Sequence, residues 1–398
     1  MKKGLVLGLM LFALPMMAQE NAAKKDANEK NVFTVVKEVG RTSVKDQANS
    51  GTCWSYSGQG FFEEELLRIG KKGYDLSEMF VVDHSYRDKA RKYVRLDGHL
   101  NFEQGGSFYD VLYVLKHYGA VPRSAMMGLN YGTTKNQHNE LAEVLKAYLA
   151  AVVKNPNKKL STAWQAGFDA ILDAYLGKLP ETFRYNGKEY TPKTYAKELG
   201  LNPDDYVSLT SYTHHPFYEK FAIEVPDNWR WSESYNLPID ELMEVMSKAI
   251  DNGYSFAWGA DVTEQGFTRD GLGVLVDLEE MNHAGSDFAH WFGGTVNRFN
   301  LQKAVHRADV PEINPTQEYR QEGYDNKTLT DDHGMTIFGK AVNQNGRKFY
   351  MVKNSWGETG DYKGIWYVSE NYVKGRTMNI LINKNAIPKD IAKKLGLK

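Results

Sequence analysis

The chain has 398 residues, of which 42% are hydrophobic and 25% are charged. A chain of this length and composition can bury a large hydrophobic core, either as two or three domains or as one large domain with insertions. Its 49 Lys and Arg residues balance 50 Asp and Glu residues, so the formal net charge is −1. This balance excludes the basic footprint of a nucleic-acid-binding protein and gives no charged membrane-binding surface.

The first residues, MKKGLVLGLMLFALPMMAQE, have the layout of a signal peptide. Lys2 and Lys3 precede an apolar segment that is too short to span a bilayer comfortably, and Ala18 is a suitable small residue before a cleavage site. We therefore expect residues 1–18 to be a signal peptide and 19–31 a flexible polar leader, and the protein to be exported to a bacterial periplasm or secreted. An N-terminal membrane anchor is the alternative. No other apolar run reaches about 18 residues, so we expect no membrane insertion after cleavage.

Helical periodicity dominates the next part of the chain. The segment WSYSGQGFFEEELLRI places Phe62, Leu66 and Ile69 on one face of a helix that begins near Cys53. Further helices are indicated over 76–93 and 107–118, with glycines at their ends. Residues 32–134 are therefore expected to form a helical part that carries the cysteine.

The residue pattern of the sequence changes twice after residue 134. Residues 135–250 are expected to form a mostly helical insertion with a turn-rich break near 180–240. Residues 251–387 are rich in β-branched and aromatic residues separated by glycines, which indicates strands, with a hairpin turn at Asn343–Gly346. Residues 388–398 form a C-terminal arm. The pattern predicts an α+β fold with helices first and an antiparallel sheet later.

Cys53 is the only cysteine of the chain, so it has no partner for an internal disulfide. One interpretation is a buried structural thiol, because free cysteine is often a small core residue. The other is a reactive nucleophile. The turn-forming residues 47–51 place Cys53 where a loop becomes a helix, and a helix N-terminus favours the thiolate over the thiol.

A nucleophilic cysteine also needs an imidazole to accept its proton, and the chain offers ten histidines. His84 and His117 lie in predicted helices, where ordinary packing or surface roles are expected. Two further pairs occupy loops or turns: His214 with His215, and His283 with His290. No histidine has a recognisable metal-ligand spacing, so we expect neither a metal nor a cofactor.

His333 is distinguished by its context. It lies in TDDHGMTIFGKAV at the start of a predicted strand, and Asn354 lies 21 residues later, where the returning strand ends in KNSWGETG. Two neighbouring antiparallel strands can hold these side chains together, so that the asparagine carbonyl fixes the imidazole tautomer. Trp356 could shield that hydrogen bond from water. The alternatives are a turn residue for Asn354 and a core aromatic for Trp356.

Three segments together resemble the papain-type cysteine peptidases. QANSGTCWSYS has a glutamine, a cysteine six residues later and then a tryptophan, while DHGM and KNSWG are similar to the histidine and asparagine motifs. His333 follows Cys53 by 280 residues, far more than a papain-type domain needs, so a large insertion lies between them. This organisation, with segments such as EQGGSFYDVLYVLKHYGAVPRSAM and RQEGYDNKTLTDDHGM, resembles the bleomycin hydrolase/aminopeptidase C family.

The resemblance implies a papain-like fold, with a helical left part, a sheet or barrel on the right and a large helical insertion. It implies that Cys53 is the nucleophile and that His333 is the general base and later the general acid. Asn354 would orient the imidazole. Gln47 would donate its side-chain amide to an oxyanion hole together with the backbone N–H of Cys53. The reaction implied is peptide hydrolysis without a cofactor.

The resemblance also implies a set of substrate-binding residues. Gly105 and Gly106 would form a glycine strip along which a peptide backbone approaches closely, although a plain helix-start turn is the alternative. Trp54 and Trp356 would flank the cleft. The C-terminal arm would lie in the cleft, with the carboxylate of Lys398 meeting the free amine of the substrate. A homohexamer is implied as well.

We therefore expect a thiol peptidase that acts on peptide substrates, as an aminopeptidase gated by its arm. An exported endopeptidase or a transpeptidase or amidase is an alternative use of the same chemistry. A catalytically silent peptide-binding protein is an alternative of another class. The intact set of Gln47, Cys53, His333 and Asn354 argues against the silent protein.

Overall fold

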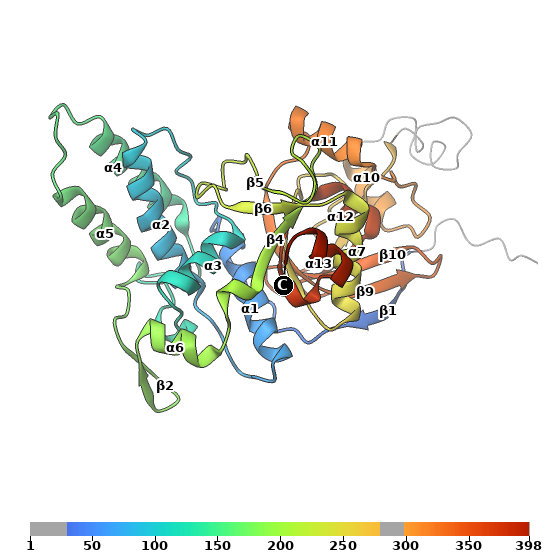
Figure 1. Ribbon diagram of the computed structural model, residues 1–398, viewed down its shortest axis with the longest axis horizontal. Helices are drawn as coiled ribbons and strands as arrows, with labels where there is room; N and C mark the ends of the chain where they lie inside the picture. The colour runs from blue at the N-terminus through green and yellow to red at the C-terminus, as the bar shows by residue number, and fades with distance from the viewer. Residues whose placement is uncertain (1–29, 279–297, 398) are drawn as a thin grey trace, which may run out of the picture.

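The helices of the first half gather on one side of the molecule and the strands of the second half on the other (Figure 1). This arrangement is seen in a computed structural model that describes residues 30–278 and 298–397. The α+β fold predicted from the sequence is confirmed. The proposed signal peptide and most of the leader lie outside the described residues. No helix in the described ranges is long and apolar enough to cross a membrane.

The three helices predicted before residue 134 are present. They are α1 (Cys53–Arg68), α2 (Glu78–Arg95) and α3 (Phe108–His117). The side chain of Ser77 accepts a hydrogen bond from the backbone N–H of Phe80 and caps α2, while Ser107 and Asp110 form a capping box at α3. These caps satisfy backbone donors that a helix leaves unpaired in its first turn, so they fix where each helix begins.

The segment 135–250 contains more strand than its sequence indicates. Its helices are α4 (His138–Val153), α5 (Ala163–Leu176), α6 (Pro192–Leu199) and α7 (Ile239–Asp251). The turn-rich break holds a small hairpin, β2 (Phe183–Tyr185) with β3 (Lys188–Tyr190), and three strands of the main sheet: β4 (Tyr206–Thr210), β5 (Lys220–Ala222) and β6 (Glu233–Asn236). These strands have only three to five residues each, too few for a clear alternation of polar and apolar residues.

The remaining strands of the main sheet are β1 (Phe33–Glu38), β7 (Phe256–Ala260), β8 (Leu272–Gly273), β9 (His333–Asn343), β10 (Lys348–Lys353), β11 (Ile365–Ser369) and β12 (Thr377–Asn383). In the described chain the order is β5-β6-β4-β12-β7-β9-β10-β11-β8, with β1 paired to β9. The hairpin predicted at Asn343–Gly346 joins β9 to β10. Most neighbouring strands of the sheet are antiparallel, as predicted, while β4 with β6 and β8 with β11 run parallel and make the sheet mixed.

The other helices follow or flank the strands. They are α10 (Arg298–Val305), α11 (Gln317–Asn326), α12 (Glu370–Arg376) and α13 (Lys389–Lys394), with short 3-10 turns at Arg123–Ala125, Pro203–Asp205 and Lys384–Ala386. The C-terminal arm forms α13. Its Ile391 and Leu395 are buried in the same core as α7, and Lys394 forms an ion pair with Glu241 at 2.7 Å.

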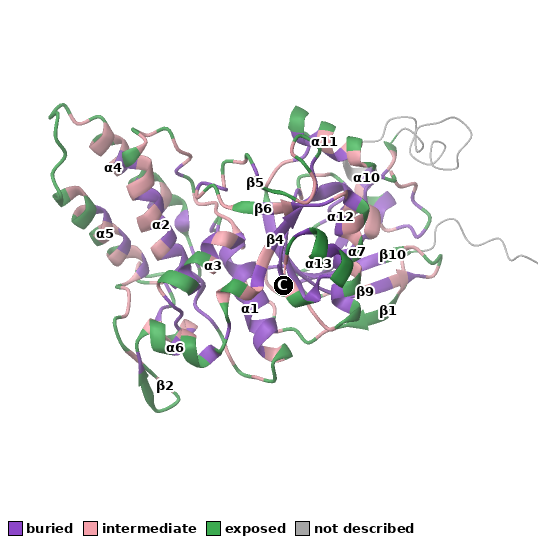
Figure 2. Ribbon diagram, in the orientation of Figure 1, coloured by how far each residue is buried: buried purple, intermediate pink, exposed green. Residues whose placement is uncertain are grey.

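Helix α1 lies between the two halves and is buried on almost every side (Figure 2). All of its residues from Trp54 to Leu66 are buried, so its environment is not the half-exposed surface that its apolar face predicts. It packs against α2 and α3 on one side and against β7 and β9 on the other. The first residue of α1 is thereby held against the first residues of β9.

Burial of α1 on both sides places three consecutive carboxyl side chains inside the protein, and each has a basic partner. Glu64 lies 2.6 Å from the ammonium nitrogen of Lys353, which is the last residue of β10. Glu63 pairs with Lys45 and Glu65 with Arg68. The Glu64–Lys353 ion pair joins the helix that begins at Cys53 to the strand that leads into Asn354.

We predict that Lys353→Met destabilises the protein by about 3–5 kcal/mol, because it leaves Glu64 as an unpaired buried charge. The double variant Glu64→Leu/Lys353→Met removes both charges and should recover most of that loss. Urea unfolding of the two variants measures the difference. Equal stabilities for the single and double variants would contradict the structural role of this pair.

Candidate active site

Cys53 is the first residue of α1 and follows a buried threonine. Its half-exposed thiol lines two adjoining cavities that His333 also lines. Burial, with the nearby charges of Asp331 and Asp227 adding to it and the backbone N–H groups of Gly334 and Trp54 opposing it, raises the pKa of the Cys53 thiol to about 12. The thiolate therefore needs a proton acceptor and a compensating positive charge close by.

His333 is the first residue of β9, where it pairs with the last residue of β7. Its Nε2 lies 2.7 Å from Oδ1 of Asn354. The same oxygen accepts the backbone N–H of Ser355 at 2.7 Å, which identifies it as the carbonyl oxygen of the amide. Nε2 of His333 must then carry the proton and donate, and Nδ1 keeps the lone pair that can accept a proton from the thiol.

The electrostatics of the cavity favour proton transfer within a pair over ionisation of one group alone. Burial lowers the pKa of His333 to about 4, and the hydrogen bond to Asn354 only partly opposes this shift. A single charge on Cys53 or on His333 is disfavoured by desolvation. Transfer of the thiol proton to the imidazole creates both charges together, and their attraction and the N-terminus of α1 offset the desolvation cost.

Trp356 lies against the imidazole, with its ring centroid 4.7 Å from that of His333. It also makes edge-to-face contacts with Trp366 and Phe267 in the core of the sheet. The partly buried indole therefore packs against the core of the sheet and against the imidazole, while its shielding of the His333–Asn354 hydrogen bond stays a prediction.

Gln47 is buried, and hydrogen bonds hold both its side chain and its backbone. Its side-chain oxygen accepts from the hydroxyl of Ser355 at 2.6 Å, and its amide nitrogen donates to the carbonyl of Ser50 at 2.7 Å. Its backbone N–H donates to the carbonyl of Ser355. Because the oxygen is engaged, the amide NH₂ is oriented, and its second N–H is left for the cavity that Gln47 lines with Cys53 and His333.

The glycine pair 105–106 is required by close packing. A Cβ on Gly106 would lie 2.8 Å from the ring of Trp54, and a Cβ on Gly105 would lie 2.0 Å from a carboxylate oxygen of Asp227. Trp54 is itself buried, and its indole N–H donates to the carbonyl of Gln104 at 3.1 Å. Trp54 thus packs against Gly106 and also lines the cavity. Lys398 lies outside the described residues.

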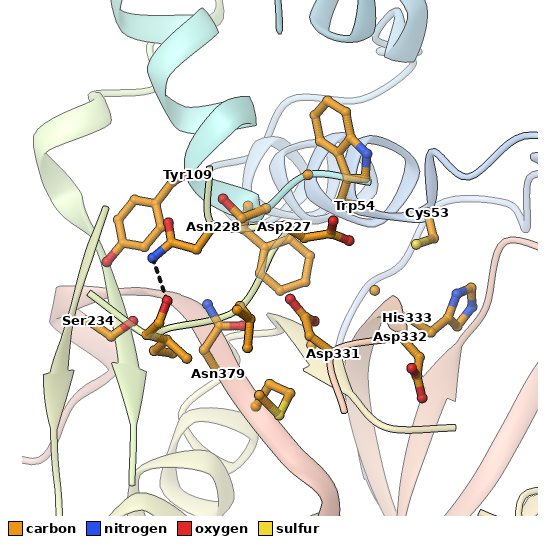
Figure 3. A pocket seen from close by; sticks show the side chains of 18 residues that line it. Cys53, Trp54, Tyr109, Asp227, Asn228, Ser234, Asp331, Asp332, His333 and Asn379 are labelled. Carbon is orange, nitrogen blue, oxygen red and sulfur yellow. Dashed lines mark hydrogen bonds between the residues drawn. The ribbon is translucent and has the colours of Figure 1, made fainter. Parts of the chain in front are cut away.

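The cavity also contains residues that the sequence did not single out. Figure 3 shows Asp227 and Asp331 among the side chains that line the same cavity as Cys53 and His333. Asp331 was visible in the histidine motif itself, two residues before His333. Asp227 lies in the loop after β5, and no local pattern connects that loop with a site formed by α1 and β9.

Two groups of side chains in the described ranges could hold a cation, and neither contains a residue of the Cys53–His333–Asn354 set. Glu224 accepts from His214 and His215 at 3.1 and 3.0 Å, and Asp270 is bonded to His306 at 2.8 Å near Asp361. The histidines at 283 and 290 lie outside the described residues.

A family model described as the peptidase C1-like family matches residues 80–397 of this chain. The protein belongs to that family. The matched segment contains His333 and Asn354 but begins after Cys53 and Gln47, whose place in the site rests on the geometry above. The resemblance to papain-type cysteine peptidases is thereby confirmed.

Curated relatives and a solved structure agree with this family. Cysteine proteinase 1, mitochondrial, of Saccharomyces cerevisiae is 22% identical over 94% of this chain and 81% of its own length. Aminopeptidase C of Lactobacillus helveticus is 22% identical over 91% of this chain and 83% of its own. The crystal structure of pepW from Lactobacillus rhamnosis HN001 has a TM-score of 0.69 at 21% identity, covering 91% of this chain and 84% of that chain. The shared fold is thereby established.

We predict that the rate of Cys53 alkylation by iodoacetamide is nearly constant from about pH 5 to 7 and falls below the His333 pKa of about 4. Protonation of His333 from solvent removes the acceptor of the thiol proton, so the alkylation rate falls at low pH. In His333→Ala the rate should instead rise about tenfold per pH unit throughout, since only the thiol with its raised pKa remains. Intact-mass measurement is unambiguous because Cys53 is the only thiol. Identical pH profiles would contradict the pairing.

Proposed function

We propose that this thiol peptidase is an aminopeptidase that removes residues from the N-termini of peptides. The observation that carries the proposal is the cavity in which Cys53 meets an imidazole fixed by the 2.7 Å hydrogen bond to Asn354. Family membership supports the peptidase chemistry. The names aminopeptidase C and aminopeptidase G among the relatives support the preference for N-termini.

The reaction follows from the proton positions in the site. Nδ1 of His333 accepts the thiol proton as the sulfur of Cys53 forms a bond to the peptide carbonyl carbon. The carbonyl oxygen becomes an oxyanion, which the side-chain amide of Gln47 and the backbone N–H of Cys53 can stabilise. The C–N bond then breaks, and His333 gives its proton to the leaving amine.

The second half of the reaction reverses these roles. His333 accepts a proton from water, and the resulting hydroxide attacks the thioester carbonyl. The C–S bond breaks, the carboxylate product leaves, and Cys53 regains a proton. Asn354 holds the imidazole in one orientation through both halves, because its oxygen accepts from Nε2 whether or not Nδ1 is protonated.

The contribution of the C-terminal arm to this selectivity stays a prediction. Residues Lys389–Lys394 form α13 against α7, and Leu397 lines a surface hollow with Tyr109 and Lys384. Neither cavity that contains Cys53 is lined by a described residue of the arm.

Export and assembly are further parts of the proposal, supported by the signal-like start and by the family resemblance. N-terminal sequencing of the protein secreted by its native host would show whether residues 1–18 are removed. Sedimentation of the mature chain would show whether it forms a hexamer.

We predict that Cys53→Ala lowers the rate of aminoacyl-coumarin hydrolysis by roughly 10³-fold or more, because no other group of the site can form the thioester. Thermal unfolding of the variant should match that of the wild type, since only one small side chain changes. Wild-type turnover in the Cys53→Ala variant would exclude the thiol mechanism. The absence of turnover in both proteins would instead favour a silent peptide-binding protein.

We predict that Gln47→Glu lowers kcat by roughly 10²–10³-fold with little change in KM, because the isosteric carboxylate replaces the NH₂ donor that the oxyanion needs. The iodoacetamide reaction of Cys53 is the control, since alkylation develops no oxyanion and should stay close to the wild-type rate. A loss of kcat accompanied by an equal loss of alkylation would show that Gln47 acts on the thiol and not on the oxyanion.

A further inference from the structure

Three carboxyl side chains line the cavity that contains Cys53, those of Asp227, Asp331 and Asp332, and the reaction described above uses none of them (Figure 3). Asp227 comes from the loop after β5, and Asp331 comes from the loop before β9. Both also line the adjoining open cavity that Gln47 and Cys53 share. Neither accepts a hydrogen bond or forms an ion pair with another described residue.

Asp331 lies in a strongly acidic environment. Burial, together with the charges of Asp227 and Asp332, raises its pKa to about 7. Asp332 differs, because it accepts hydrogen bonds from Thr330 and Val262. Asp331 is half-buried, and carboxylates withdrawn from water are usually paired, so the Asp331 side chain can accept a cation or a hydrogen-bond donor from the cavity.

Asp227 also lacks a hydrogen-bonded partner, although the ammonium group of Lys89 lies near it. Burial raises its pKa, the charge of Lys89 opposes the shift, and Asp110 and Glu103 add to it. Lys89 is engaged elsewhere, since its ammonium group donates to the carbonyls of Glu103 and Gly105 at 2.8 Å. The carboxylate of Asp227 is therefore left to face the cavity.

The position of Asp227 limits how far a substrate can extend. Its carboxylate lies directly on Gly105, where a Cβ would meet Oδ2 at 2.0 Å. A peptide that runs from Cys53 along Gly106 towards Gly105 would thus end against this carboxylate. The part of the peptide on the acyl side of the scissile bond must therefore be short.

We propose that Asp227 and Asp331 bind the protonated α-amino group of the substrate and restrict the enzyme to peptides with a free N-terminus and a short acyl part. This inference rests on the proposed peptidase function and assigns its selectivity to side chains within the cavity. An ammonium group offers three N–H donors and one positive charge, which matches two carboxylates without other partners.

The two carboxylates also couple substrate binding to the nucleophile. Their charges raise the pKa of the Cys53 thiol, so the empty site disfavours the thiolate. A bound ammonium group neutralises them and removes this penalty. Peptides with a blocked amine should therefore lose kcat as well as affinity.

The pH dependence has a definite sign. With a pKa of about 7, Asp331 loses its charge as the pH falls through 7, and the α-amine of the substrate loses its proton above about 8. The value of kcat/KM for free-amine substrates should therefore be greatest between these values. In Asp331→Asn the acid limb near 7 should disappear.

The first test compares Ala-Ala-coumarylamide with its N-acetyl form in wild type, Asp227→Asn, Asp331→Asn and the double variant. In the double variant the ratio of the two kcat/KM values should fall by roughly 10- to 100-fold or more, the loss of one or two charge-assisted hydrogen bonds. Glu224→Gln is the matched control. The carboxylate of Glu224 lies on the same loop as Asp227 but is already partnered by His214 and His215, so the ratio of the two kcat/KM values should not change in this variant. An unchanged ratio in the double variant overturns the proposal.

The second test does not depend on hydrolysis. Ala-Ala-amide should protect Cys53 of the wild type from iodoacetamide, its N-acetyl form should not, and the double variant should lose this difference. Equal protection by both peptides overturns the amine site even if the chain proves to be no peptidase. Preferential protection by N-acetyl-lysine-amide would also overturn it, because the carboxylates would then serve a basic side chain. A chain ending at Leu395, which keeps α13, should retain the selectivity for a free amine. Loss of that selectivity in the truncated chain would assign the amine site to the arm.

Discussion

The burial of α1 between the helical half and the sheet is the constraint on which the site depends. A helix exposed on one side could shift along its axis, but every residue from Trp54 to Leu66 is enclosed. The ion pair of Glu64 with Lys353 then sets the position of α1 relative to β10. Because Cys53 begins this helix and Asn354 follows that strand, the same packing that stabilises the fold fixes the nucleophile and the residue that orients its base.

A series of hydrogen bonds connects the base to the proposed oxyanion donor and fixes the orientation of both. Asn354 accepts from His333 and from the backbone of Ser355, and the hydroxyl of Ser355 donates to Gln47. Each bond fixes the orientation of an amide or a tautomer that would otherwise be free. Ser355 thus links the residue that orients the imidazole to the proposed oxyanion donor.

The sequence revealed the chemistry better than the surroundings of the site. Local signals were enough for Cys53 at a loop-to-helix junction, for His333 at a strand start and for the hairpin that brings Asn354 beside it. The three short strands β4 to β6 were missed because strands of three to five residues carry little periodicity. Asp227 was missed because its place at Gly105 depends on the packing of a distant loop, which no local pattern encodes.

The proposed reaction requires that Cys53, activated by His333, forms a covalent acyl intermediate with peptides. Mixing the protein with an aminoacyl ester, quenching in acid within milliseconds and measuring the intact mass tests this most directly. The expected result is an added mass equal to the acyl group, located on the proteolytic fragment that contains Cys53. Turnover of the ester with no adduct at any time, or an adduct on another residue, would contradict it.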